Sequence, residues 1–144
     1  MPTFVYKVIK TSWGICVSVA GEVAVEAIAS LEPQLMKVGG FAMRTELPQT
    51  TSDSCSRLPA EDRLAIERGL AIVDKIATPP AGACFLLTLQ ELSYPLTDYQ
   101  SEGVTCAVIG LLCSSLGLAI PTVGVHYDKI ANRYVFDFSM ALSG

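Results

Sequence analysis

The stretch Ala83-Cys84-Phe85-Leu86-Leu87-Thr88-Leu89, residues 83–89, decides the fold of this chain. Apolar side chains occupy both of its alternating faces, as in a strand that is covered, or nearly covered, on both sides of a sheet. Gln90, Glu91 and Ser93 then mark its emergence into solvent. Helical patterns lie on both sides of this stretch, so the sequence predicts a sheet packed against helices.

Two helices are expected, one before and one after this strand. The first begins at Leu58-Pro59-Ala60-Glu61-Asp62, where a proline takes a first helical position and two acids lie in the first turn, which the helix dipole favours. It ends at Thr78-Pro79-Pro80. Thr97 and Gln100, spaced as a capping box with Asp98 as an alternative cap, mark the start of the second helix, which stops at Gly117. Its apolar positions are Val104, Ala107, Val108, Leu111, Leu112 and Leu116.

The other periodic segments are mostly strands. Residues 21–31 are the exception, because Val23, Ala27 and Leu31 share a helical spacing that predicts a short helix. Gly39-Gly40 indicates a turn or bulge, and the polar residues 49–57 indicate a solvated loop. Asn132 tolerates the left-handed conformation that the last hairpin needs. The expected strands cover residues 4–9, 13–20, 41–47, 123–127 and 134–138.

Length and composition are consistent with this arrangement of elements. The chain has 144 residues, close to the size of one domain, so we expect residues 1–144 to form a single domain. The order of elements predicts the α+β class, with an antiparallel or mixed β-sheet and two or three helices packed on one face. Apolar residues make up 51% and charged residues only 17%. Either the core is large or some apolar surface meets a partner.

Charge argues against a nucleic-acid partner. Lys and Arg total 10 against 14 Asp and Glu, and no basic stripe with interleaved aromatics is present to neutralise phosphates. The longest apolar stretch, residues 104–120, is interrupted by Gly110 and Gly117 and falls short of the roughly 20 residues that span a bilayer. The N-terminal residues lack a signal-peptide pattern. We therefore expect no membrane association.

The five cysteines form no closely spaced pair, and their odd number favours reduced thiols and a cytoplasmic location. Four of them lie in apolar segments and are expected to be core residues: Cys16, Cys84, Cys106 and Cys113. Cys55 lies instead in the polar loop. With His126 as the only histidine and no metal-ligand or phosphate-loop spacing, the sequence predicts no metal and no cofactor. A thiol nucleophile, Cys55 or another cysteine, with His126 as its base remains an alternative function.

A family resemblance covers residues 58–118. Its residues are the helix Ala65-Ile66-Glu67-Arg68-Gly69-Leu70, then Ala81-Gly82 before the strand Phe85-Leu86-Leu87-Thr88-Leu89, then Leu96-Thr97-Asp98-Tyr99-Gln100-Ser101 at a helix start. This order resembles domain IV of translation elongation factor G and its relatives of the ribosomal protein S5 domain 2-type fold. The resemblance implies a stand-alone translation-factor-like domain that associates with the ribosome. The long basic loops of that family are not evident in this sequence.

Aromatic content points to a protein partner. Tyrosine and tryptophan anchor many interfaces, and this chain combines several of them with a low surface charge. The main hypothesis is a non-enzymatic binding protein, in particular an acidic inhibitor or immunity-type protein that masks another protein, or a homo-oligomer. The candidate binding residues are Trp13, Tyr94, Tyr99, Tyr127, Tyr134 and His126.

Overall fold

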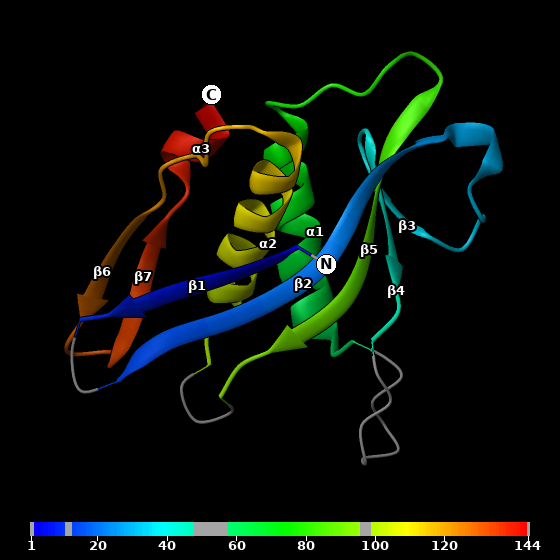
Figure 1. Ribbon diagram of the computed structural model, residues 1–144. Coiled ribbons are helices and arrows are strands. Elements are labelled where there is room, and N and C mark those ends of the chain that lie inside the picture. The colour runs from blue at the N-terminus through cyan, green and yellow to red at the C-terminus, as the bar shows by residue number, and fades with distance from the viewer. Residues whose placement is uncertain (1, 11–12, 48–57, 96–98, 144) are drawn as a thin grey trace.

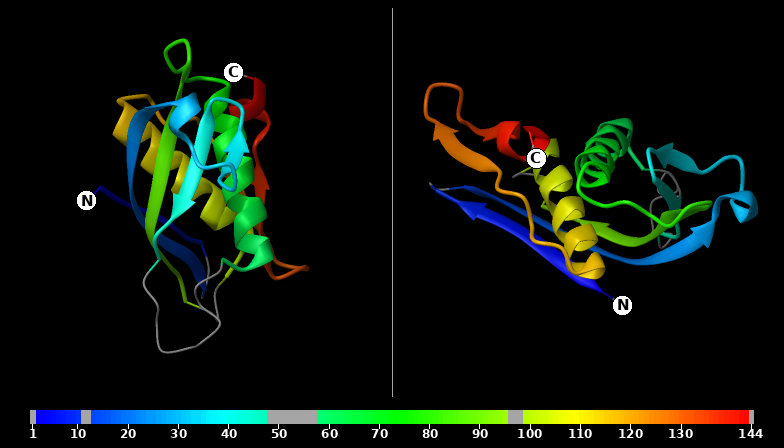
Figure 2. Two further views of the ribbon diagram at one scale, coloured as in Figure 1. Left: turned by 90° about the vertical axis from the view of Figure 1, so that its right-hand side faces the viewer. Right: turned by 90° about the horizontal axis from the view of Figure 1, so that it is seen from above.

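A five-stranded mixed sheet with two long helices on one face forms the body of the molecule (Figures 1 and 2). The computed structural model describes residues 2–10, 13–47, 58–95 and 99–143. The predicted α+β class, with a sheet and helices on one of its faces, is confirmed. The elements in chain order are β1 (Thr3–Ile9), β2 (Gly14–Ala27), the 3₁₀ turn η1 (Ile28–Ser30), β3 (Met36–Val38), β4 (Phe41–Thr45), α1 (Ala60–Asp74), β5 (Ala83–Ser93), α2 (Ser101–Leu116), β6 (Gly124–Asp128), β7 (Arg133–Asp137) and α3 (Ser139–Ser143).

The strand order in the sheet is β1-β2-β5-β4-β3. All neighbours are antiparallel except β4 and β5, which are parallel and are joined through α1. The long strand β2 pairs with β1 over residues 14–20 and with β5 over residues 18–27, with a bulge at Ala20/Gly21. β2 therefore links the N-terminal hairpin to the central strand.

The short helix predicted at residues 21–31 is wrong. β2 continues through Ala27, and only the single 3₁₀ turn η1 follows it. The ladder with β5 explains the difference, because Val23 lies opposite Leu87 and Val25 opposite Phe85. β-Branched residues with partners on a neighbouring strand favour the extended form over helical spacing alone.

Gly39-Gly40 turns the chain between β3 and β4, as predicted. Gly39 has a φ of 55°, a left-handed conformation that glycine adopts without strain. The Gly40 N–H donates to Asp74 Oδ1 at 2.8 Å, which ties the turn to the end of α1. The strand β3 itself was not predicted, and residues 49–57 lie outside the described residues.

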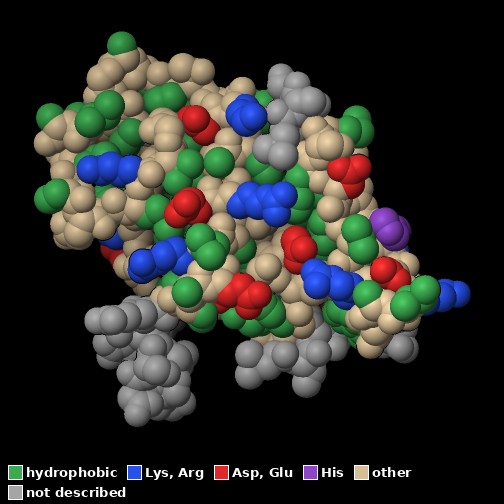
Figure 3. Space-filling view, turned by 180° about the vertical axis from the view of Figure 1, so that it is seen from behind, with side chains coloured by type: hydrophobic (Ala, Val, Ile, Leu, Met, Phe, Trp, Pro, Cys, Tyr) green, Lys and Arg blue, Asp and Glu red, His purple; other side chains and the backbone are tan. Residues whose placement is uncertain are grey.

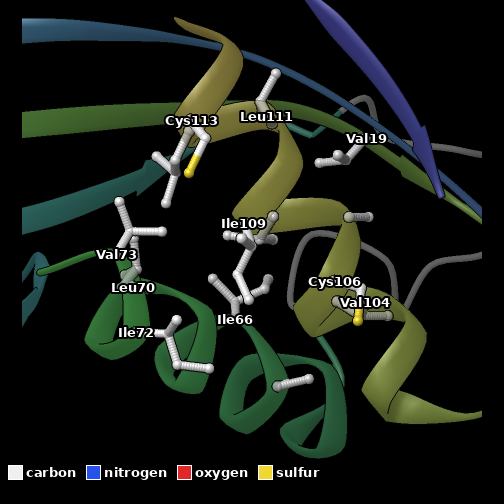
Figure 4. Close-up of a cluster of buried hydrophobic side chains, with 14 of the residues drawn as sticks. Val19, Ile66, Leu70, Ile72, Val73, Val104, Cys106, Ile109, Leu111 and Cys113 are labelled. Carbon is white, nitrogen blue, oxygen red and sulfur yellow. The ribbon is translucent and has the colours of Figure 1, made fainter. Parts of the chain in front are cut away.

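The core lies between the sheet and the two helices, as Figure 4 shows for side chains of α1 and α2. Glycines allow α2 to approach the sheet closely, since a Cβ at Gly103 would lie 2.5 Å from Ile15 Cγ2. Cys106 and Cys113 are buried in this layer, and Cys16 is partly buried. On the opposite face of the sheet, Cys84 and two neighbours pack beneath Leu31 and Leu35. The expected coverage of both faces of residues 83–89 is thus confirmed.

The predicted C-terminal hairpin forms a separate two-stranded sheet, β6–β7, beside α2 (Figure 1). Asn132 in its turn has a φ of 53°, as expected. Gly117 ends α2 in the left-handed conformation, and the Leu118 N–H bonds to the Cys113 carbonyl at 2.8 Å. No helix in the described part of the chain combines the length and the apolar character that crossing a membrane requires.

Candidate functional site

Three of the predicted binding residues form one aromatic cluster. Trp13 directly precedes β2, and its ring centroid lies 4.9 Å from that of Tyr134 on β7 and 6.2 Å from that of Tyr127 on β6. Both pairs are arranged edge to face. The two tyrosine rings are 5.2 Å apart. This geometry is favourable for aromatic pairs. The cluster joins the N-terminal hairpin to the C-terminal one.

Hydrogen bonds hold this cluster in place. The Tyr134 hydroxyl donates to the Trp13 carbonyl at 2.8 Å and accepts from the Lys10 N–H at 2.9 Å. The Trp13 indole N–H donates to Asn132 Oδ1 at 3.1 Å, and the Tyr127 hydroxyl donates to the same oxygen. The indole is therefore held in one orientation by residues of the chain itself.

The other two predicted tyrosines form a second cluster around a buried acid. The rings of Tyr94 and Tyr99 lie 4.5 Å apart. Both hydroxyls donate to Asp62 in the first turn of α1, that of Tyr94 at 2.6 Å to Oδ2 and that of Tyr99 to Oδ1. Asp62 is only 1% exposed. The sequence indicated a helix-start acid here, and the two tyrosine partners could not be read from it.

Burial raises the pKa of Tyr94 and of Tyr99, and their hydrogen bonds to Asp62 raise it further. Burial likewise raises the pKa of Tyr6, with a smaller effect of Cys106. Each of these three side chains therefore keeps its proton in the folded chain at a pH where an exposed tyrosine has lost it.

Three of the five tyrosines are therefore expected to ionise only after unfolding. In the unfolded chain they titrate near pH 10, so the unfolded state binds fewer protons than the folded state above that pH. Their contribution to stability is complete below about pH 10 and is lost as the pH rises further. During an alkaline titration, the tyrosinate absorbance of these three side chains should rise only together with the loss of circular dichroism. Titration of all five tyrosines in the folded protein would contradict this.

Gln100 positions the hairpin against α2. It is the N-cap residue of α2, and its buried side-chain amide bonds to both backbone groups of Tyr134. Nε2 donates to the Tyr134 carbonyl at 2.9 Å, and Oε1 accepts from the Tyr134 N–H at 2.6 Å. The side chain thus bonds to β7 as a neighbouring strand would. The predicted capping box is wrong for Gln100, because this residue precedes the first helical residue, Ser101, instead of occupying the third helical position. Its predicted partner Thr97 lies outside the described residues.

A pocket of about 360 Å³ lies between the two aromatic clusters. Trp13 forms one wall and Tyr99 another, so we call it the Trp13–Tyr99 pocket. The first turn of α1, the start of α2 and the hairpin turn supply the polar part of its lining. Besides the two aromatic residues, the lining comprises Glu61, Gln100, Ser101, Glu102, Ala131, Asn132 and Arg133.

A larger cavity of about 480 Å³ lies near β3 and β4. Its described lining contains methionines and leucines but no aromatic side chain. Arg44 and Glu32 in its wall form an ion pair at 2.6 Å. Because the described part of this cavity's lining has no rigid aromatic anchor, we take the Trp13–Tyr99 pocket as the candidate site.

The other sequence-predicted groups do not join this pocket. His126 is exposed on β6, and the molecule's single histidine is visible at the surface in Figure 3. Burial raises the pKa of Cys84 and Cys113, and it raises that of Cys106 to about 12. The described lining of the pocket includes neither cysteine nor histidine. Within the described ranges, no three His, Cys, Asp or Glu side chains gather where they could hold a metal ion.

Charges of both signs are interspersed on the helix-bearing side of the molecule (Figure 3). Comparison of the sequence with models of protein families and with curated proteins gave no match. The geometry of the pocket is therefore the basis for assigning a function.

Proposed function

We propose that this chain is a non-enzymatic binding protein that masks a partner protein, as an acidic inhibitor or immunity-type protein does. The observation that carries the proposal is the Trp13–Tyr99 pocket, whose aromatic walls are held by hydrogen bonds to Asn132 and Asp62. Rigid tryptophan and tyrosine side chains dominate the binding energy of many interfaces. Preorganisation reduces the entropy lost on binding. The net charge of −4 favours a basic partner.

Two other functions stay predictions. Ribosome association rests on the family resemblance, and α1, β5 and α2 follow one another in the order that the resemblance implies. The carboxylates around the pocket, however, do not favour binding of the phosphates of ribosomal RNA. A thiol enzyme would require a reactive cysteine. Cys55 lies outside the described residues, and the raised pKa of a described thiol such as Cys106 leaves little thiolate at neutral pH. The cytoplasmic location is part of the proposal, since the described cysteines are free thiols.

A pair of neighbouring substitutions tests the proposal. Ala131 lines the pocket, whereas Ile130 is fully exposed and is not part of its lining. Ala131→Phe should fill the pocket without changing charge and weaken partner binding by about tenfold or more, as expected for a hot spot. Ile130→Phe should leave binding unchanged. The measurement is capture of a stoichiometric partner by the immobilised chain, with light scattering to detect self-association.

Equal capture by the two variants would show that the pocket is not the interface. A wild-type chain that stays monomeric and captures no partner at stoichiometric level would contradict the proposed function itself. Thermal unfolding of both variants controls for loss of fold.

A further inference from the structure

Arg133 and Glu102 form an asymmetric ion pair at the Trp13–Tyr99 pocket. One Arg133 guanidinium nitrogen lies 3.5 Å from Glu102 Oε2. The other carboxylate oxygen of Glu102 accepts a hydrogen bond from Gln100 Nε2 at 3.4 Å. The Glu102 side chain is 25% exposed and that of Arg133 is 54% exposed. The acid is thus held by the protein, while the cation meets it through one long contact from the solvent side.

The charges around this pair balance only while Arg133 is in place. Glu61 and Glu102 line the pocket, and Asp62 lies directly behind Tyr99. Against these three carboxylates stand the side chains of Arg133 and Arg68 and the N-termini of α1 and α2. Each helix N-terminus carries about half a positive charge. Arg68 lines an adjoining cavity, with its guanidinium 4.3 Å from the centre of the Phe138 ring. If Arg133 turns away, the pocket has the greater need of a cation.

The aromatic walls favour the same kind of ligand. A guanidinium or ammonium group gains cation–π attraction over tryptophan or tyrosine, more when it is withdrawn from water. Arg133 reaches the carboxylate from an exposed position, and an exposed pair of this kind contributes little to stability. A side chain that enters between Trp13 and Tyr99 would add the aromatic contact to the same carboxylate.

We infer that the Trp13–Tyr99 pocket receives a cationic side chain, arginine or lysine, of the partner protein. This inference rests on the proposed function. Arg133 is the internal side chain that this cation displaces from Glu102. Arg133 therefore lowers the affinity of the pocket for its ligand, and Glu102 raises it.

Trp13 is the only tryptophan, so its fluorescence reports on this pocket directly. The probes are capped Gly-Arg-Gly and Gly-Lys-Gly peptides, with the neutral citrulline analogue of the first as the control ligand, at low ionic strength. Arg133→Gln should tighten binding of the cationic peptides about two- to fivefold, the range expected for release of one surface ion pair. Glu102→Gln should weaken it by a similar factor.

Arg44→Gln is the matched control, because it breaks the Arg44–Glu32 pair elsewhere on the molecule. It should leave the affinity unchanged. Equal affinity for the arginine and citrulline peptides would overturn the inference that the ligand is a cation. The same holds if the fluorescence of Trp13 responds to neither cationic peptide in the wild type and in Arg133→Gln. Cationic binding that Arg133→Gln does not tighten would overturn the displacement. If the peptide experiment fails but Ala131→Phe still weakens capture of the partner, the proposed function stands and only the cationic ligand is excluded. The two outcomes can be separated because Ala131→Phe changes no charge.

Discussion

Replacing Asp62 by alanine is expected to lower the free energy of unfolding by about 2–4 kcal/mol. The substitution removes the acceptor of both the Tyr94 and the Tyr99 hydroxyl. Each hydrogen bond to a charged group contributes about 1.5–3 kcal/mol, and water that enters the vacated space recovers part of the loss. Urea unfolding followed by circular dichroism measures the change, with an unchanged m-value indicating that the unfolded state is unaffected.

Glu61→Ala is the control for this prediction. Glu61 is also an acid in the first turn of α1, but its side chain is exposed. Its loss should remove only the interaction with the helix dipole, about 0.3–1 kcal/mol. Should the two alanine variants lose equal stability, the tyrosine network would have no stabilising role beyond helix-end electrostatics.

Local patterns in the sequence were sufficient for most elements of this fold. The helix at residues 60–74 and the C-terminal hairpin each have a clear period, whereas the strand that begins at Ala83 is a continuous apolar run with a polar end. Residues 21–27 were misjudged because helical spacing and strand propensity coexist there, and the choice depends on the distant partner β5. The helix α3 is only five residues long and has no periodic signal of its own.

The candidate site was only partly predictable. The aromatic residues were identified by type, but composition cannot show that Trp13 meets Tyr134 while Tyr99 meets Tyr94. Asp62 was interpreted as a helix-start acid, which it also is. The polar lining was missed because Glu102 and Arg133 are brought together only when the hairpin docks on α2. The available signals were a first-turn acid and a turn flanked by an arginine, both common in any sequence.

The docking of the hairpin thus links the stability of the chain to the geometry of the candidate site. Asn132 and Arg133 reach the Trp13–Tyr99 pocket from the turn between β6 and β7. Gln100 fixes the position of β7 through Tyr134, whose hydroxyl in turn bonds to Trp13. Loss of this one amide should therefore disturb the cluster of Trp13, Tyr127 and Tyr134.

Gln100→Ala is expected to cost about 2–4 kcal/mol of stability, because it leaves the N–H and the carbonyl of the buried Tyr134 without their partner. Looser docking of β7 should also expose Trp13, whose ring contacts Tyr134 at 4.9 Å. The fluorescence emission of Trp13 should then shift to the red in the folded variant. Gln34→Ala, at an exposed loop position, should change neither quantity. Stability within about 0.5 kcal/mol of wild type and unshifted emission in Gln100→Ala would mean that the aromatic cluster alone holds the hairpin on α2.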